Sequence, residues 1–432
     1  MDYREARVYL EELSKYGSVL GLESMKELLR RLGNPQDELR FLHISGTNGK
    51  GSVLAYLSTV LSEAGYRTGR YISPTLFSYR ERIQVDGERI EKEALARHVT
   101  AIAEAIRGME AEHKGSPTVF EVETALGFLY FKEKGCDIVV LETGLGGALD
   151  ATNVIQTPVL EVIASISMDH MDVLGDTLEK IALQKAGIIK PGTSVVSAAQ
   201  EPEAAQVLAD VCAEKGCKLY VTEPEKISEV RYGCGKQSFS YKHWENMEIS
   251  LAGSFQIFNA CLALEAIDAL KREGWEITEQ QVREGMAKAQ WKGRFTLISQ
   301  KPAIVLDGAH NPAAARELRH SLELYFPGKK LHYIFGVFRD KDYRQVITLT
   351  APLAEHIITI QTPGNPRALP AKELMEAVKQ VNPSVEAADS IGDAVEKSLK
   401  NAGEEDAVII FGSLSFLGEA LKEVTNRGKY NG

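Results

Sequence analysis

The stretch LRFLHISGTNGKGSVLAYLSTVLSEA, residues 39–64, decides the fold because a glycine-rich turn joins an apolar run to an amphipathic segment. Residues 41–44 are typical of a buried strand, and apolar residues recur with helical spacing from Val53 to Leu61. A strand, a glycine-rich turn and a helix in this order surround one anion with backbone N–H groups and a helix N-terminus. The sequence therefore predicts a phosphate-binding loop.

The residue types in the turn suit a nucleotide phosphate. Its glycines let the backbone approach phosphate oxygens, Lys50 would neutralise the terminal phosphates, and the Ser52 hydroxyl would face a magnesium ion. The spacing departs from G-x-x-x-x-G-K-[ST], because Ile44 stands six residues before Lys50 and Gly51 separates the lysine from the serine. A turn that only connects two elements is the alternative, which the flanking strand and helix disfavour.

Composition narrows the class of protein. The chain has 432 residues, enough for two or three domains, with 44% hydrophobic and 25% charged residues, as in ordinary globular proteins. The formal net charge of -10 argues against general binding to nucleic acid or to a membrane surface. No apolar run approaches the roughly 18 residues of a membrane span. The charged, amphipathic N-terminus, MDYREARVYLEEL, is not that of a signal peptide.

The five cysteines are scattered along the chain, and none forms a CxxC pair. This pattern favours free thiols in a reducing compartment over disulfides or zinc. We therefore expect a cytoplasmic protein.

Polar residues follow three further strand-like runs. Ser73 follows the run that begins at Tyr66, Glu142 ends the apolar run 136–142, and His170 follows the run 162–167. Ligands of open α/β sheets bind beyond the carboxyl ends of the strands, and a carboxylate beside the phosphate-loop strand commonly binds magnesium. Two of these residues also have ordinary explanations, which are turn chemistry for Ser73 and a surface position for His170.

Several segments are explained first by local structure. Thr118 and Glu121 fit a capping box at the start of a helix to residue 131. Residues 176–179 cap a second helix, with Lys185 near its C-terminus and Gly187 as its C′ glycine. The glycines at 144–147 resemble a dinucleotide fingerprint, but no helical pattern follows them, so we do not expect NAD binding.

The order of the elements predicts an α/β protein of two domains. Residues 1–32 form two helical stretches broken at Gly17 and Gly21, and the phosphate loop lies in a mostly parallel sheet. Beyond residue 296, strands alternate with helices, which predicts a smaller, doubly wound α/β domain. We therefore expect one domain at 1–296 and a second at 297–432.

Eight segments in this order resemble the folylpolyglutamate synthase and dihydrofolate synthase family, relatives of the Mur ligases. They span nearly the whole chain, and their agreement in register makes the resemblance specific. They are GTNGKGS (46–52), SP (73–74), YRERI (79–83), LETGLGGALDATN (141–153), DHMDVLGDTLEKIALQKAGIIKPG (169–192), GRF (293–295), LDGAHNP (306–312) and DKD (340–342).

The resemblance implies a Mur-ligase-like ATPase domain, followed by a C-terminal glutamate-ligase domain, and assigns site residues. It implies catalytic roles for Lys50, His170 and Lys185, the last of which is carbamylated in relatives. It implies magnesium ligands at Ser52, Ser73, Glu142 and His170. The implied ATP contacts are Thr47, Asn48, Gly49, Lys50, Gly51, Ser52, Asn259, Arg294, Asp307 and His310, and the implied folate contacts are Thr118, Phe120, Glu121, Leu149, Asp150 and Ala151. Three residues depart from the family pattern: Thr75, Ala148 and Met171.

The implied reaction is ATP-dependent addition of L-glutamate to a reduced folate, and to dihydropteroate as a second candidate substrate, through an acyl phosphate. ATP and Mg²⁺ are the implied cofactors, with a monovalent cation such as K⁺ as a further candidate. We expect small-molecule partners only, no nucleic acid or membrane, and a monomer. Two alternatives remain: a Mur-type ligase that acts on a nucleotide-linked substrate, and a non-catalytic ATP-dependent switch protein.

Overall fold

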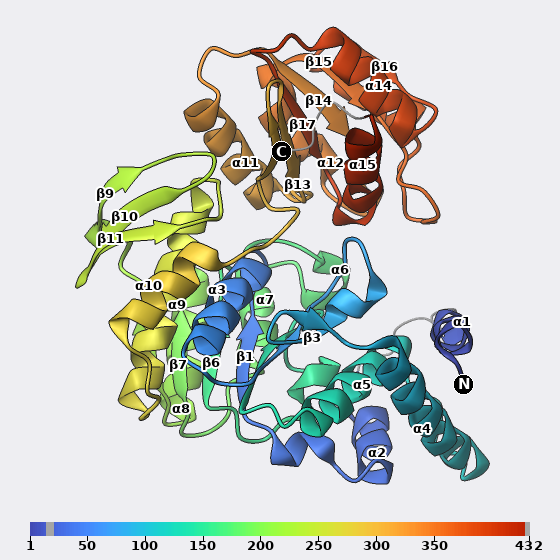
Figure 1. The fold of residues 1–432 in the computed structure, drawn as a ribbon, viewed down its shortest axis with the longest axis vertical. Coiled ribbons are helices and arrows are strands. Elements are labelled where there is room, and N and C mark those ends of the chain that lie inside the picture. Colours follow the sequence, from blue (N-terminus) through green and yellow to red (C-terminus); the bar gives the residue numbers. More distant parts are fainter. Residues whose placement is uncertain (14–20, 428–432) are drawn as a thin grey trace. The chain divides into compact units, whose positions relative to one another are not determined.

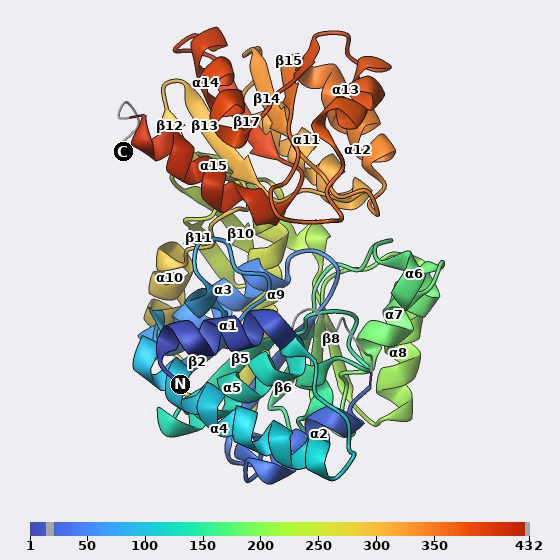
Figure 2. The same cartoon turned by 90° about the vertical axis from the view of Figure 1, so that its right-hand side faces the viewer.

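The computed structural model describes residues 1–13 and 21–427 (Figures 1 and 2). The chain divides into two compact units, of which the first is formed by Met1–Pro224 with Asn259–Met286 and the second by Glu225–Phe258 with Ala287–Gly432. Packing therefore assigns residues 225–258 to the same unit as the C-terminal part of the chain. The functional division expected at residue 296 stays a prediction.

The first unit contains an eight-stranded sheet in the order β4-β3-β2-β5-β1-β6-β7-β8. The six strands from β2 to β8 in this order are parallel, and β3 and β4 add an antiparallel edge. The strands are β1 (Phe41–Ser45), β2 (Thr68–Tyr71), β3 (Ile83–Val85), β4 (Glu88–Arg89), β5 (Ile138–Glu142), β6 (Leu160–Ile163), β7 (Ser194–Ser197) and β8 (Lys218–Val221). The expected mostly parallel sheet is confirmed.

Helices cover both faces of this sheet. On β2, Arg70 hydrogen-bonds Thr59 of α3, whereas the next residue, Tyr71, hydrogen-bonds Thr124 of α5. Because successive strand residues point to opposite faces, α3 and α5 lie on opposite sides of the sheet. The helices of this part of the chain are α1 (Tyr3–Leu13), α2 (Glu23–Arg31), α3 (Lys50–Glu63), α4 (Lys92–Ala111), α5 (Val119–Glu133), α6 (Met171–Leu174), α7 (Leu178–Ala186), α8 (Pro202–Glu214), α9 (Phe255–Arg272) and α10 (Glu279–Lys288).

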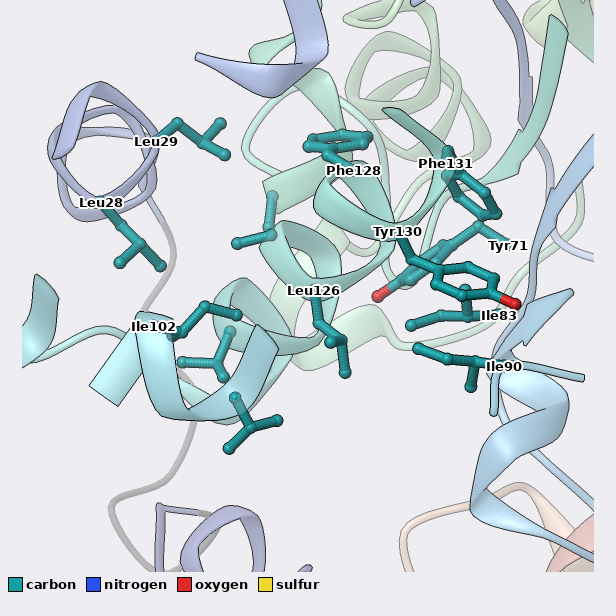
Figure 3. Packing of buried hydrophobic residues seen from close by; sticks show 14 of the residues in the cluster. Leu28, Leu29, Tyr71, Ile83, Ile90, Ile102, Leu126, Phe128, Tyr130 and Phe131 are labelled. Carbon is teal, nitrogen blue, oxygen red and sulfur yellow. The ribbon is translucent and has the colours of Figure 1, made fainter. Parts of the chain in front are cut away.

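A hydrophobic core fills the space between the sheet and helices α1, α2, α4 and α5 (Figure 3). Leu126 and Phe128 of α5 lie among side chains from α2 and α4, and Phe131 lies beside Tyr71 (Figure 3). The ring of Phe128 meets the ring of Phe41 on β1 edge-on, with centroids 5.4 Å apart. This core holds α5, whose first turn contributes to the candidate site, against the strand that leads into the phosphate loop.

The second unit contains a six-stranded sheet in the order β12-β13-β17-β14-β15-β16, in which only β12 is antiparallel, and a three-stranded antiparallel sheet. Figures 1 and 2 show α11–α13 on one face of the larger sheet and α14 and α15 on the other, which confirms the doubly wound prediction. The strands are β9 (Ile227–Arg231), β10 (Gln237–Tyr241), β11 (Trp244–Ile249), β12 (Thr296–Gln300), β13 (Ala303–Asp307), β14 (Leu331–Phe335), β15 (Ala354–Thr359), β16 (Val385–Ala387) and β17 (Ala407–Phe411). The helices are α11 (Pro312–Tyr325), α12 (Tyr343–Thr350), α13 (Ala371–Lys379), α14 (Ile391–Asn401) and α15 (Leu414–Asn426).

The structure confirms most of the predicted elements and corrects one detail. The capping box at Thr118 and Glu121 is present, and only a short 3-10 helix, Ala151–Val154, follows the glycines of the 144–147 segment. Gly187 ends α7 in a right-handed conformation instead of the expected left-handed one. A Cβ atom there would lie 2.4 Å from Cβ of Ala148, so close packing explains this glycine. Gly17 lies outside the described residues, and no described helix is long and apolar enough to cross a membrane.

We predict that Leu126→Ala destabilises the protein by about 2–5 kcal/mol, because it leaves a cavity in a fully buried part of the core. Leu183→Ala is the matched control, since Leu183 lies on α7 with 57% of its surface exposed and its truncation should cost less than about 0.5 kcal/mol. Urea unfolding followed by circular dichroism measures both. Equal destabilisation by the two substitutions would contradict the described core.

Candidate functional site

The phosphate loop has the predicted strand–turn–helix geometry, from β1 through residues 46–49 into α3. Two glycines are required by close approach as well as by their positive φ angles of 146° at Gly46 and 88° at Gly49. A Cβ atom on Gly46 would lie 2.8 Å from Cβ of Ala164, and one on Gly49 would lie 2.4 Å from Oδ1 of Asn259. The structure therefore places Asn259 of α9 directly against the loop, although it lies more than 200 residues away in the sequence.

Hydrogen bonds join the phosphate loop to the segment that follows β6. The backbone N–H groups of Thr47 and Asn48 both donate to the carbonyl oxygen of Ser165, over 2.7 and 3.2 Å. The Thr47 hydroxyl donates to the carbonyl of Ser167 and accepts the N–H of the same residue, each over 3.0 Å. These two amides therefore hold the loop in place. The amides suited to an anion are those of the first turn of α3, because helix N-termini leave their N–H groups without intrahelical acceptors.

Two lysines converge on one carbonyl oxygen of the loop. Nζ of Lys50 lies 3.0 Å from the carbonyl oxygen of Gly46, and Nζ of Lys185 lies 2.8 Å from the same oxygen. Burial lowers the pKa of Lys185 to about 7, and the positive charge of Lys50 adds to this effect, while Asp169 and Asp150 oppose it. Lys185 is therefore partly neutral near pH 7, unlike an ordinary lysine.

The predicted metal ligands lie at the carboxyl ends of neighbouring strands. Glu142 ends β5 and is paired in register with Ile44 of β1, so its buried carboxylate lies beside the start of the phosphate loop. Ser73 follows β2 on the other side of β5, and its N–H donates to Oε2 of Glu142 over 3.3 Å. The topology thus brings Ser52, Ser73 and Glu142 to the same edge of the sheet.

His170 reaches this edge from the segment after β6, the strand that pairs with β1 on its other side. It adopts a left-handed conformation with φ of 51°, where α6 begins, and its N–H donates to Oδ1 of Asp169 over 2.9 Å. Hydroxyl and carboxylate oxygens are the ligands that Mg²⁺ prefers, so Ser52, Ser73 and Glu142 fit that ion, whereas the imidazole of His170 is a more usual ligand for transition metals. The described residues contain no cluster of three or more His, Cys, Asp or Glu side chains placed to hold a metal.

A cavity of about 340 Å³ opens beside these strand ends. All six residues that the resemblance implies as folate contacts line this cavity, and Ser73 is also part of its wall. Its lining residues are Gly21, Ser73, Pro74, Arg82, Thr118, Phe120, Glu121, Gly144, Leu145, Leu149, Asp150 and Ala151. Burial raises the pKa of Glu121, against the effect of its hydrogen bonds to Thr118.

Arg82 of the YRERI motif lines the cavity although it was not among the predicted substrate contacts, because the sequence left open whether its charge faces solvent or the rim of the substrate site. Its Nε atom lies 3.3 Å from Oε1 of Glu123, and both side chains are largely buried. A run of charged residues in the sequence does not reveal which member turns inward, so only the packing of α5 against this segment identifies it. The predicted folate contact Asp150 also stabilises the loop that lines the cavity. Its carboxylate accepts hydrogen bonds from the N–H groups of Gly144, Leu145 and Thr152.

The remaining predicted nucleotide contacts form a cluster within the second unit, at the carboxyl end of β13. Asp307 is buried and accepts the N–H groups of Phe295 and Ala309, each over 2.7 Å. Burial raises the pKa of this aspartate, and the nearby Arg294 opposes the shift. His310 contacts the carbonyl of Gly308 through Nδ1 over 2.7 Å. The structure therefore brings Arg294, Asp307 and His310 together, and their role toward ATP stays a prediction.

Two Mur ligase domain families match successive parts of the chain. Residues 44–267 match the Mur ligase middle domain, and residues 293–414 match the Mur ligase glutamate ligase domain. The dihydrofolate synthase/folylpolyglutamate synthase of Bacillus subtilis is 36% identical over 430 residues, which cover 98% of this chain and 99% of that protein.

Two solved structures resemble the whole chain. Folylpolyglutamate synthase of Mycobacterium tuberculosis, solved with ADP and AMPPCP, has a TM-score of 0.89 and 29% identity, with 99% of each chain covered. FolC of Escherichia coli, solved with DHPP and ADP, has a TM-score of 0.87 and 31% identity, covering 99% of this chain and 98% of that one. With a relative 36% identical along nearly its entire length, this chain belongs to the folylpolyglutamate synthase and dihydrofolate synthase family of Mur ligases.

Proposed function

We propose that this protein is an ATP-dependent ligase that forms an amide between L-glutamate and the carboxylate of a reduced folate, with dihydropteroate as a second substrate. The observation that carries the proposal is the position of Ser73. This residue lies in the wall of the substrate cavity, and its N–H contacts Glu142, which stands beside the phosphate loop. The phosphate site and the cavity are therefore contiguous, as transfer of a phosphoryl group to a bound carboxylate requires.

The first step activates the carboxylate, which does not react with an amine at neutral pH. A carboxylate oxygen attacks the γ-phosphorus of ATP in line, the bond to the β–γ bridging oxygen breaks, and ADP leaves. Lys50 and the amides at the start of α3 stabilise the charge on the transferring group. The product is an acyl phosphate with a carbonyl carbon open to attack.

The second step forms the amide. The neutral amine of glutamate attacks the acyl carbon, inorganic phosphate leaves, and the nitrogen loses a proton. Among this chain's residues, Ser52, Ser73, Glu142 and His170 are the proposed magnesium ligands. Bound Mg²⁺ would supply charge neutralisation on the phosphate oxygens. The proposal also includes contacts with ATP, implied by the resemblance to the family, from Asn259, Arg294, Asp307 and His310. It further includes a monomeric protein that works in the cytoplasm.

The direct test is an assay with ATP, L-glutamate and either tetrahydrofolate or dihydropteroate, followed by mass spectrometry. We expect ADP and a product heavier by one glutamyl residue, formed only when all three substrates are present. Lys50→Ala should lower the rate by about three orders of magnitude, because the transferring phosphoryl group loses its ammonium partner. Lys180→Ala, which removes an exposed lysine on α7, should leave the rate unchanged. A wild-type protein that yields no glutamylated product would refute the proposed function.

The cavity assignment predicts that Leu149→Ala raises KM for the folate substrate by about tenfold, because it removes an apolar contact with the pterin end. KM for ATP should not change. Leu149 is 45% exposed and Leu183 is 57% exposed, so Leu183→Ala makes the same truncation on the surface of the same unit without touching the cavity. Similar folate KM values for the two variants would show that the cavity does not bind the folate.

We also propose that Lys185 carries a carbamate. Its neutral amine adds to CO₂ and releases one proton, which converts a buried cation beside Lys50 into an anion. Because its pKa is lowered to about 7, the reactive neutral fraction grows as the pH rises, so the extent of carbamylation at constant dissolved CO₂ should increase from about pH 6 to pH 8.

Carbon-13 NMR after equilibration with labelled bicarbonate measures this modification. We expect one carbamate signal in the wild type and in Lys180→Ala, and none in Lys185→Ala. A signal that persists in Lys185→Ala would assign the modification to another amine, and a wild type without a signal would contradict carbamylation.

A further inference from the structure

His43 lies on β1 only three residues before Gly46, and none of its surface is exposed. Its side chain belongs to the face of the sheet opposite α3, the same face as Phe41, which packs against α5. Nε2 of His43 lies 2.8 Å from Oγ1 of Thr152, in the short 3-10 helix that follows the cavity loop. The proposed reaction does not use this histidine.

The contacts of Thr152 determine which nitrogen of His43 carries the proton. The Thr152 hydroxyl donates its single proton to Oδ1 of Asp150 over 2.6 Å, so it can only accept from the imidazole. His43 is therefore the donor, in the form protonated at Nε2. Burial lowers the pKa of His43 to about 3, with a smaller contribution from Lys190, so the ring stays neutral at physiological pH.

Asp150 connects Thr152 to the wall of the substrate cavity through hydrogen bonds. Its Oδ2 atom accepts the N–H groups of Gly144 and Leu145, over 2.9 and 2.8 Å, and its Oδ1 atom accepts the N–H of Thr152 over 3.0 Å. Gly144, Leu145, Leu149, Asp150 and Ala151 make up five of the twelve residues that line the cavity. An unbroken chain of hydrogen bonds thus runs from the phosphate-loop strand to three residues of the cavity lining, which are Asp150, Gly144 and Leu145.

We propose that His43 is a positioning residue, which holds the cavity wall at a fixed place relative to the phosphate loop through the chain His43–Thr152–Asp150–Gly144/Leu145. The inference rests on the proposed function, because it assigns the reacting carboxylate to this cavity. A buried chain in which every donor meets an acceptor is rigid, and loss of one member leaves the next one unsatisfied. Displacement of the wall by a fraction of an ångström would misalign the carboxylate with the γ-phosphoryl group.

The test compares variants that differ only in the donor. His43→Gln can place an amide N–H near the position of Nε2, whereas His43→Leu fills the space without a donor. We expect His43→Leu to raise KM for the folate substrate and to lower kcat, each by about tenfold, with KM for ATP unchanged. His43→Gln should restore both values to within about threefold of the wild type.

Two further variants locate the effect. Thr152→Val breaks the chain one step later, so its effect should not add to that of His43→Leu in the double variant. His332→Leu is the control, because His332 is a buried histidine of the second unit that hydrogen-bonds Asp406 and belongs neither to the phosphate loop nor to the residues that line the cavity. It should leave both KM values and kcat unchanged.

Nitrogen-15 NMR of the histidine-labelled wild type provides a readout that does not need ligase activity. The signal of His43 is the one that disappears in His43→Gln or changes its chemical shift in Thr152→Val. It should show protonation at Nε2 only and no titration between about pH 5 and pH 8. A tautomer protonated at Nδ1, or additive effects in the double variant, would overturn the inference. So would an active wild type whose folate KM and kcat are unaffected by His43→Leu. A wild type without any ligase activity but with the expected tautomer would instead contradict the proposed function.

Discussion

The site depends on one topological constraint, which is that β2, β5, β1 and β6 are parallel neighbours whose carboxyl ends meet at one edge of the sheet. Each strand delivers one component there: Ser73, Glu142, the phosphate loop, and the segment with His170. No component is near another in sequence. A single antiparallel strand among the four would carry its residue to the opposite edge, so the parallel order is what assembles the chemistry.

Charge balance at this edge explains why two lysines are tolerated close together. Lys50 and Lys185 share the carbonyl oxygen of Gly46 as an acceptor, which alone cannot offset two ammonium groups of which one is buried. The lowered pKa of Lys185 relieves this repulsion by letting the more buried lysine lose its charge. Deprotonation makes the same nitrogen a nucleophile, so the electrostatics of the loop and the chemistry proposed for Lys185 have a common cause.

Sequence periodicity was sufficient for the two larger sheets, because strands such as β13 and β17 are continuous apolar runs and the helices between them are strongly amphipathic. Site residues at strand ends were predictable for the same reason, since the parallel topology fixes where those ends lie. Contacts set by tertiary packing were not predictable. Nothing local indicates that Arg82 turns into the cavity, that His43 is joined to Asp150 through Thr152, or that Gly187 is required by its contact with Ala148. These depend on which segments pack together across more than 30 residues of sequence.

The proposed reaction depends on direct transfer of a phosphoryl group from a nucleotide bound at the loop to a carboxylate in the adjoining cavity. The most direct measurement uses a folate substrate labelled with oxygen-18 in its reacting carboxylate and follows the label by mass spectrometry of the released phosphate. The account predicts that one labelled oxygen appears in inorganic phosphate for each amide formed, because that oxygen bridges carbon and phosphorus in the acyl phosphate. Unlabelled phosphate, or release of AMP and pyrophosphate in place of ADP, would contradict it.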